Sequence, residues 1–250
     1  MQNRPKCYGI IPARYGSTRF MGKPLADILG KPMFWHVFKR ANQCEKLSSI
    51  TLATDDKKIF SAAKKLNVPV VMTSKDHQSG TDRVLEAARL INVPEKAIVV
   101  NIQGDEPAIE PAMLSELVQP FIFSDTQVTT LAQVISLKEA ENPNQVKVVC
   151  ADNGQALYFS RSLIPYNRGK TKIEILGHIG LYAFRMDILK KYSALSPGKL
   201  ESAEKLEQLR LLENNIPILV KITKHKSFGV DTPEDIKIVT KLLKKNMEKN

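Results

Sequence analysis

Short apolar segments alternate along the first 120 residues with longer segments in which apolar residues recur every three or four positions. The short segments are rich in β-branched residues, as is typical of buried strands, and cover residues 8–11, 50–53, 68–72 and 98–102. The longer segments have the period of amphipathic helices and cover residues 32–44, 56–66 and 81–92. This alternation predicts an α/β fold with a mostly parallel, doubly wound sheet covered by helices on both faces.

After residue 120 the pattern changes to strands that can pair directly with their neighbours in sequence. Residues 146–150 and 156–159 flank the segment 152–154, Asp-Asn-Gly, whose residue types suit the turn of a hairpin. Another strand is predicted at 179–184. We therefore expect an inserted antiparallel lobe over approximately 121–215.

The carboxyl-terminal part returns to the alternating pattern. A helix is predicted at 200–214 and a strand at 218–222, separated by Pro217. The segment that begins with Thr232 and Pro233 has the residue types that open a helix, and the basic, amphipathic tail continues that helix. No repeat or low-complexity linker divides the chain, so we expect a single domain, 1–250.

Composition narrows the possible partners. The 37 Lys and Arg residues against 26 Asp and Glu give a net charge of +11, which predicts an anionic partner: nucleic acid, a membrane surface or a phosphorylated metabolite. Only 6% of residues are aromatic, and the sequence has no RNA-binding motif or stacking platform, so we expect no nucleic acid partner. No segment has the ~20 apolar residues of a spanning helix, and no secretory signal precedes the first strand, so we expect a cytoplasmic protein without membrane insertion.

The three cysteines, Cys7, Cys44 and Cys150, are far apart in the chain. That spacing fits neither a disulfide framework nor the paired ligands of a zinc site. We therefore expect buried free thiols.

The first strand leads into a loop rich in cations, hydroxyls and glycines, GIIPARYGSTRFMGKPL (residues 9–25). In an open α/β sheet this loop lies at the carboxyl edge, where ligands bind. Its donors suit a triphosphate, and they are Arg14, Arg19, Lys23, Ser17, Thr18, Gly16 and Gly22. The spacing excludes a P-loop, and no G-x-G-x-x-G supports a dinucleotide oxidoreductase. A solvated basic loop is the alternative interpretation.

Two carboxylates are candidates for a metal site. Asp105 ends the strand 98–102 in the run NIQGDEP and should lie at the same edge as the basic loop, where a hard carboxylate beside a triphosphate suits Mg2+. Asp231 precedes the last helix in the run GVDTP. Helix capping also explains the run Asp-Thr-Pro-Glu that begins at Asp231, and without Asp105 we would favour that interpretation of Asp231.

In these segments the chain resembles the 3-deoxy-manno-octulosonate cytidylyltransferases, also called CMP-Kdo synthetases. The resemblance is nearly end to end. It rests on the ordered runs IIPARYGSTRFMGKPL, DHQSGTDR, NIQGDEP, NPNQVKVV, ALYFSRSLIP, HIGLYAFR, EKLEQLR and GVDTPEDI. One position departs from the family pattern, because Met21 stands where R-x-P-G-K-P has proline. This change removes no charge or hydrogen-bond donor.

The resemblance implies a nucleotide-diphospho-sugar transferase-like, Rossmann-like fold and transfer of CMP from CTP to 3-deoxy-D-manno-octulosonate (Kdo), with diphosphate released, for lipopolysaccharide biosynthesis. It implies Mg2+ as cofactor and a homodimer in which the antiparallel lobe, around residues 179–184, binds the sugar and forms the dimer. The implied nucleotide ligands are Arg14, Ser17, Arg19 and Lys23 for the triphosphate and Ser79, Gly80 and Gln103 for cytidine. The implied metal ligands are Asp105 and Asp231, which act in catalysis with Arg14 and Lys23. The implied acidic-sugar pocket consists of Arg161, His178, Tyr182, Glu207 and Gln208.

The residue types alone are compatible with other interpretations of several of these residues. Arg161 suits a sugar carboxylate because a guanidinium donates two parallel hydrogen bonds, but arginine is also an ordinary surface residue. His178 and Tyr182 lie four positions apart and share a face of an extended strand, although a lone histidine there is more often structural. Other acidic sugars, an amino variant of Kdo or sialic acid, are alternative substrates, and a basic nucleic-acid-binding protein is the alternative outside enzymes.

Overall fold

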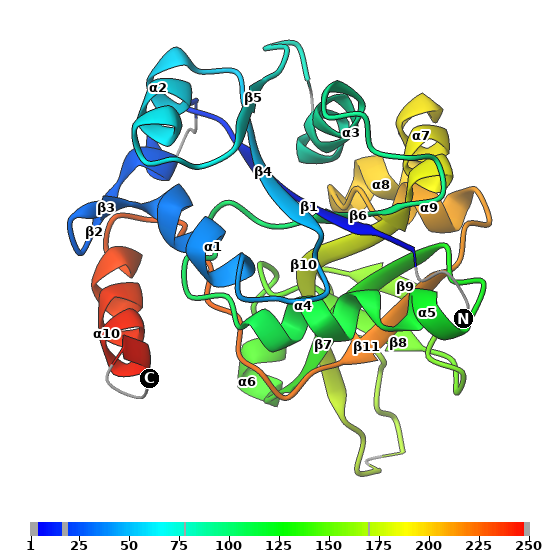
Figure 1. Cartoon of the computed structure of the whole chain (residues 1–250). Helices are drawn as coiled ribbons and strands as arrows, with labels where there is room; N and C mark the ends of the chain where they lie inside the picture. Colours follow the sequence, from blue (N-terminus) through cyan, green and yellow to red (C-terminus); the bar gives the residue numbers. More distant parts are fainter. Residues whose placement is uncertain (1–4, 17–19, 78, 170, 248–250) are drawn as a thin grey trace.

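The computed structural model describes residues 5–16, 20–77, 79–169 and 171–247, and within these residues nine strands form one mixed sheet (Figure 1). Seven strands follow the order β11-β7-β10-β6-β1-β4-β5, and the β8–β9 hairpin continues the sheet beside β10. The strands are β1 (Cys7–Ala13), β4 (Ser49–Thr54), β5 (Val70–Met72), β6 (Ile98–Asn101), β7 (Val128–Ile135), β8 (Lys147–Cys150), β9 (Ala156–Ser160), β10 (Ile175–Arg185) and β11 (Ile218–Ile222). A separate ribbon pairs β2 (Asp27–Ile28) with β3 (Lys31–Pro32).

The first half of the chain has the predicted parallel architecture. β1 pairs in parallel with both β4 and β6, and β4 pairs in parallel with β5. The connections contain α1 (Met33–Ala41), α2 (Lys57–Lys65) and α3 (Gly80–Leu90), which lie inside the helical segments expected from the sequence or within one residue of them. The alternating apolar pattern therefore predicted this region correctly, because β1, β4 and β6 are buried on both faces and each helix on one.

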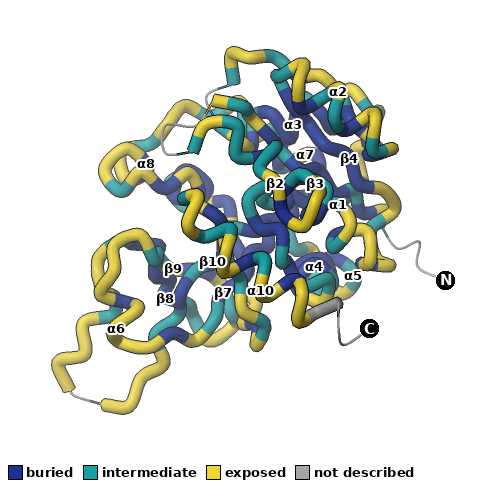
Figure 2. Tube along the Cα trace, turned by 90° about the vertical axis from the view of Figure 1, so that its left-hand side faces the viewer, coloured by how far each residue is buried: buried dark blue, intermediate teal, exposed yellow. Residues whose placement is uncertain are grey.

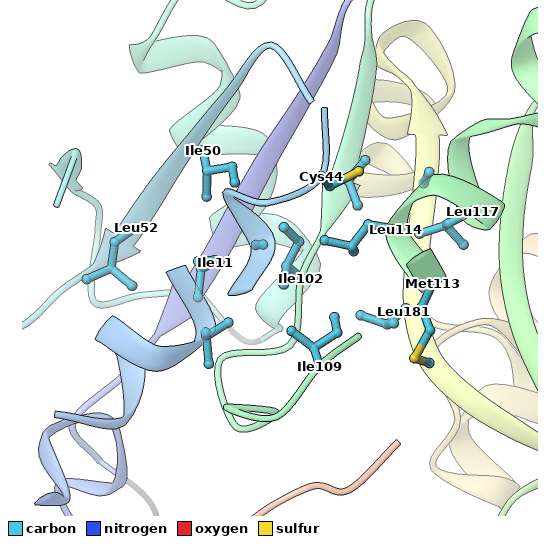
Figure 3. Packing of buried hydrophobic residues seen from close by; sticks show 14 of the residues in the cluster. Ile11, Cys44, Ile50, Leu52, Ile102, Ile109, Met113, Leu114, Leu117 and Leu181 are labelled. Carbon is cyan, nitrogen blue, oxygen red and sulfur yellow. The ribbon is translucent and has the colours of Figure 1, made fainter. Parts of the chain in front are cut away.

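Helices cover both faces of the sheet. On one face, α1, α2 and α4 (Pro111–Val118) pack against the sheet, and Figure 3 shows Leu114 and Leu117 of α4 in this cluster with Ile11 of β1. On the other face, α3 and α7 (Met186–Ala194) pack against side chains that include Val99. The sheet is therefore doubly wound, as predicted.

The antiparallel part is continuous with this sheet. β10 lies between β6 and β7 and is antiparallel to both, while β7 is parallel to β11. The predicted strand 179–184 is the buried carboxyl-terminal part of β10, where Ile179 is 4% and Phe184 is 3% exposed, so these side chains offer no apolar surface to a second subunit. The expectation that this strand presents a dimer surface is thus corrected, because neighbours on both sides cover it.

The single helix predicted at 200–214 was wrong. The segment forms α8 (Lys199–Glu204) and α9 (Leu209–Glu213), and the break lies at Lys205, whose φ of 53° is in the left-handed region. Contacts from distant residues fix this break, as described below. The sequence analysis also missed β7, α4 and α7, whose polar interruptions obscure their periodicity.

The last helix, α10 (Asp235–Met247), returns to the beginning of the fold. Val239 and Leu243 pack with Ile28 and Met33, and this contact places the segment before α10 next to the loop after β1. The shorter helices are η1 (Lys23–Leu25), α5 (Pro120–Phe123) and α6 (Leu137–Ala140). In the described part of the chain, every helix is too short or too polar to cross a lipid bilayer.

Candidate active site

A cavity of about 510 Å³ opens where β1 and β6 end, between the sheet, the start of α3 and the turn that joins α8 to α9. Eleven of the predicted site residues line it: Arg14, Lys23, Ser79, Gly80, Gln103, Asp105, His178, Tyr182, Glu207, Gln208 and Asp231. Ser17 and Arg19, with Thr18, lie outside the described residues. Segments far apart in sequence thus meet in one cavity at the sheet edge where open α/β folds bind ligands.

One end of the cavity is ionic. The ammonium of Lys23 donates to Asp105 Oδ2 at 2.7 Å and lies 3.8 Å from Asp231 Oδ1. It also donates to the carbonyl of Val230 at 2.8 Å, and the N–H of Val230 donates to the carbonyl of Asp105 at 2.9 Å. The two candidate metal ligands therefore lie within 4 Å of one cation, although several helices and strands separate them in sequence.

A glycine brings the Asp105 loop against the first strand. A Cβ at Gly104 would lie only 2.6 Å from the carbonyl oxygen of Pro12, a distance that no side chain tolerates. Gly104 thus allows the end of β6 to approach the end of β1 closely. This approach places Asp105 beside Lys23.

At the start of α10, the carboxylate of Asp235 is the acceptor for backbone groups. Asp235 Oδ2 accepts hydrogen bonds at 2.9 Å from the N–H groups of both Asp231 and Thr232, and these bonds lower the pKa of Asp235. Asp231 is 55% exposed at its side chain and is directed to Lys23. Asp235 therefore accepts backbone N–H groups at this helix start, and the role of Asp231 as a metal ligand remains a prediction.

These donors fit a magnesium ion that arrives with a nucleotide. Among the described residues, no group of three or more His, Cys, Asp and Glu side chains is arranged to hold a metal. Mg2+ binds to proteins through one or two carboxylates and completes its shell with water and substrate phosphates. Asp105 and Asp231 supply that number of carboxylates.

The start of α3 forms a second wall. The hydroxyl of Ser79 accepts a hydrogen bond from the N–H of Asp82 at 3.1 Å, which caps the helix. Gln103 closes the wall from the sheet side, since its Nε2 donates to the carbonyl of Gly180 at 2.7 Å. Two of the three predicted cytidine contacts, Ser79 and Gln103, are thus held in fixed orientations.

The sequence analysis did not single out Arg83, which is buried beneath this wall. Its guanidinium donates to Asp55 Oδ2 at 2.7 Å and to Thr73 Oγ1 at 2.6 Å, so it joins α3 to the segments that follow β4 and β5. Arg83 belongs to the run DHQSGTDR, which carries part of the family resemblance, and this run could have identified Arg83 as a candidate residue. Its partners, however, are distant in sequence and only the fold identifies them.

A second part of the cavity, here called the neutral end, contains the uncharged side chains of His178 and Tyr182. His178 Nε2 lies 2.9 Å from Tyr182 Oη and 3.0 Å from Thr130 Oγ1. Burial lowers the pKa of His178 to about 3 and raises the pKa of Tyr182 well above its ordinary value. His178 and Tyr182 therefore remain neutral and can exchange hydrogen bonds with an uncharged polar group.

The turn between α8 and α9 supplies Glu207 and Gln208. Thr81 Oγ1 donates to Glu207 Oε2 at 3.1 Å, which joins this turn to α3, while burial raises the pKa of Glu207. Arg210 holds α8 against α9, since its guanidinium donates to both carboxylate oxygens of Glu201, at 2.7 and 2.6 Å. The turn is therefore fixed on both sides.

Arg161 is not among the residues that line the cavity. Its guanidinium donates to three backbone carbonyls, those of Glu204 at 2.7 Å, Pro143 at 3.1 Å and Lys205 at 3.3 Å. A cation at these carbonyls stabilises the end of α8. Arg161 thus supports the turn that carries Glu207 and Gln208, and direct contact of Arg161 with a sugar remains a prediction.

Residues 8–224 match the family model described as Cytidylyltransferase. The chain is 57% identical to the 3-deoxy-manno-octulosonate cytidylyltransferase of Nitratidesulfovibrio vulgaris strain Hildenborough over 96% of this chain and 97% of that protein. It is 56% identical to the protein of the same name from Lawsonia intracellularis, over 99% and 98%. The chain belongs to the 3-deoxy-manno-octulosonate cytidylyltransferase family.

A solved structure extends this similarity to the whole fold. A CMP:2-keto-3-deoxy-manno-octonic acid synthetase complexed with CTP superposes with a TM-score of 0.92 at 42% identity and covers 96% of this chain and 99% of its own. A 4-diphosphocytidyl-2C-methyl-D-erythritol synthase superposes with a TM-score of 0.65 at 16% identity, over 96% and 98%. The second match shows the fold alone. This family member therefore has the architecture that its sequence predicted.

Proposed function

We propose that this enzyme transfers CMP from CTP to Kdo, with release of diphosphate, as a step of lipopolysaccharide biosynthesis. The observation that supports this most directly is the joining of an ionic end and a neutral, hydrogen-bonding end in one cavity. The ionic end suits a triphosphate, and the neutral end suits a polyhydroxylated sugar. The names of the close relatives and the CTP complex of a 42% identical protein support the same substrates.

The ionic end binds the nucleotide. Arg14 is exposed at the cavity rim and, with Ser17, Arg19 and Lys23, contacts the triphosphate, while Ser79, Gly80 and Gln103 contact cytidine. Asp105 and Asp231 would hold Mg2+, which would neutralise phosphate charge and lower the pKa of the attacking hydroxyl. Lys23, which contacts both carboxylates, keeps them close to the phosphates that it also binds.

The neutral end orients the sugar. His178, Tyr182, Glu207 and Gln208 bind its hydroxyls. Arg161 either binds the sugar carboxylate or holds the turn that carries Glu207 and Gln208. The anomeric hydroxyl then attacks the α-phosphorus in line, and the bond from that phosphorus to the leaving diphosphate breaks. Alignment and charge neutralisation supply the rate enhancement.

We also propose that the enzyme is a cytoplasmic homodimer. The loop between β9 and β10 is exposed along most of its length (Figure 2). It presents apolar side chains to solvent, among them Tyr166 at 88% and Ile173 at 47% exposed. Exposed apolar residues gathered on one projection favour a protein interface. Light scattering after size exclusion should give twice the chain mass, and a Tyr166→Asp variant should shift it towards the monomer.

Diphosphate release tests the reaction. We expect the highest turnover with CTP and Kdo in the presence of Mg2+, and slower turnover with UTP or with sialic acid. Faster turnover with an amino variant of Kdo would reassign the sugar within the acidic sugars. Absence of turnover with every acidic sugar would reject the proposed function.

A further inference from the structure

In the described part of the chain, five buried side-chain polar atoms have no hydrogen-bond partner: Asn101 Oδ1, Glu106 Oε2, Glu116 Oε2, Ser193 Oγ and Gln208 Nε2. Such atoms are rare because each lacks the hydrogen bonds that it makes with water in the unfolded chain. Two of them, those of Asn101 and Gln208, belong to residues that line the cavity. Both residues are more than nine-tenths buried.

Asn101 stands where the fold itself favours an apolar residue. It is the last residue of β6, and it pairs with Ile10 of β1 on one side and with Tyr182 of β10 on the other. Two positions earlier on the same face, Val99 packs in the apolar cluster beneath α3 and α7. An amide in this row loses stability relative to leucine unless a ligand completes its hydrogen bonds.

We infer that Asn101 is a specificity-determining residue that contacts a hydroxyl of the acidic sugar through its side-chain amide. Its strand partner, Tyr182, lies at the neutral end of the cavity, whereas the cations and carboxylates that suit phosphates lie at the ionic end. Gln208 faces the same cavity and offers the complementary unpartnered group, an N–H donor where Asn101 has an acceptor. A sugar hydroxyl both donates and accepts, so it matches this pair of amides. The inference rests on the proposed function.

The test compares Asn101→Leu with Ser193→Ala. The unpartnered hydroxyl of Ser193 is also buried, but Ser193 does not line the cavity. We expect Asn101→Leu to lower kcat/KM for Kdo by about 10- to 100-fold, with KM for CTP changed less than about twofold. The melting temperature of the same variant should be unchanged or should rise by up to about 2–4 °C, because an unsatisfied polar group has been removed. Ser193→Ala should share the thermal effect and leave kcat/KM unchanged.

Analogues of the sugar separate a substrate contact from a structural role. With the monodeoxy analogue of Kdo that lacks the contacted hydroxyl, the parent enzyme and Asn101→Leu should turn over equally. Equal losses with every monodeoxy analogue, or a melting temperature that falls while kcat/KM is retained, would overturn the inference. Asn101→Val, whose β-branched side chain suits a strand, provides the same comparison if the leucine variant does not fold.

The outcome is distinguishable from failure of the proposed function. If the parent enzyme releases no diphosphate with CTP and any acidic sugar, the proposed function fails, whatever the variants do. If the parent is active and Asn101→Leu retains full kcat/KM for Kdo, only the role of Asn101 fails. A loss confined to KM for CTP would place Asn101 at the nucleotide and would also overturn the inference.

Discussion

The two ends of the cavity are built in different ways. At the ionic end, Lys23 begins the short helix η1, whereas Asp105 and Asp231 come from loops, and the side chains of these two carboxylates are 33% and 55% exposed. At the neutral end, Asn101, Tyr182 and His178 come from adjacent strands of the sheet, and these side chains are buried or half-buried.

This difference indicates that one end contributes attraction of a charged ligand and the other contributes discrimination between ligands. Exposed charges on loops remain hydrated and attract a charged ligand over a distance, but they discriminate weakly between ligands of the same charge. Desolvated neutral groups attract weakly, yet a substrate that fails to pair them is rejected strongly. We therefore expect substitutions at the ionic end to reduce turnover and substitutions at the neutral end to change sugar selection.

The largest effect should come from the carboxylates. Asp105→Asn and Asp231→Asn should each lower kcat by on the order of 10²–10³-fold, because an amide keeps the shape and lacks the charge that binds Mg2+. Since both residues act through one ion, the double variant should be little worse than either single variant. Steady-state kinetics at increasing Mg2+ concentrations measures kcat for the parent, the two single variants and the double variant.

Asp125→Asn, a carboxylate outside every motif, is the control for these variants. Near-normal turnover of Asp231→Asn, with an intact circular dichroism spectrum, would contradict the shared metal and would leave Asp231 with a structural role. The contrast between the two ends would then rest on Asp105 alone.

A smaller effect is expected at Arg161, which supports the neutral end. Arg161→Lys should raise KM for Kdo by on the order of 10-fold and KM for CTP by less than about twofold, because one ammonium cannot replace a planar guanidinium with five donors. The guanidinium now donates to three carbonyls around the α8 terminus. Initial rates with each substrate varied in turn measure both constants.

Arg168→Lys, the same substitution in the exposed loop between β9 and β10, is the matched control. If Arg161→Lys changed both KM values equally, Arg161 would serve the whole cavity, and the separation between the two ends would be less sharp than the structure suggests.

The smallest effect concerns stability at acid pH. Because burial lowers the pKa of His178 to about 3, the folded protein keeps this side chain neutral while the unfolded chain protonates it near 6.5. The stabilisation is complete above pH 6.5 and is lost as the pH falls towards 3, by up to ~1.4 kcal/mol for each pH unit. His178→Gln should remove this dependence.

Denaturant unfolding at pH 7.5, 5.5 and 4.5 measures the free energy of unfolding for this test, with His225→Gln as control. The parent should lose more stability between pH 7.5 and 4.5 than His178→Gln does. Equal losses would show that His178 is hydrated in the folded protein, which would remove the contrast between the two ends.

Much of the fold and part of the site follow from local sequence. The alternating segments predicted the parallel half because β1, β4 and β6 are apolar on both faces, and no distant contact is needed to recognise such strands. The loop after β1 and the run that contains Asp105 were recognisable because each follows a buried strand, and strand ends of a parallel sheet share one edge.

Features that depend on contacts between residues far apart in sequence could be recognised only in the tertiary structure. The left-handed Lys205 divides the predicted helix 200–214 where the guanidinium of Arg161 binds the carbonyls of Glu204 and Lys205. From the sequence alone, Asn101 is an ordinary polar residue at a strand end, and only the packing of β6 between β1 and β10 shows that its side-chain oxygen is buried without a hydrogen-bond partner among the described residues. Periodicity reports which face of an element is buried, whereas hydrogen-bond satisfaction is a property of all the groups around an atom, and those groups come together only when the chain folds.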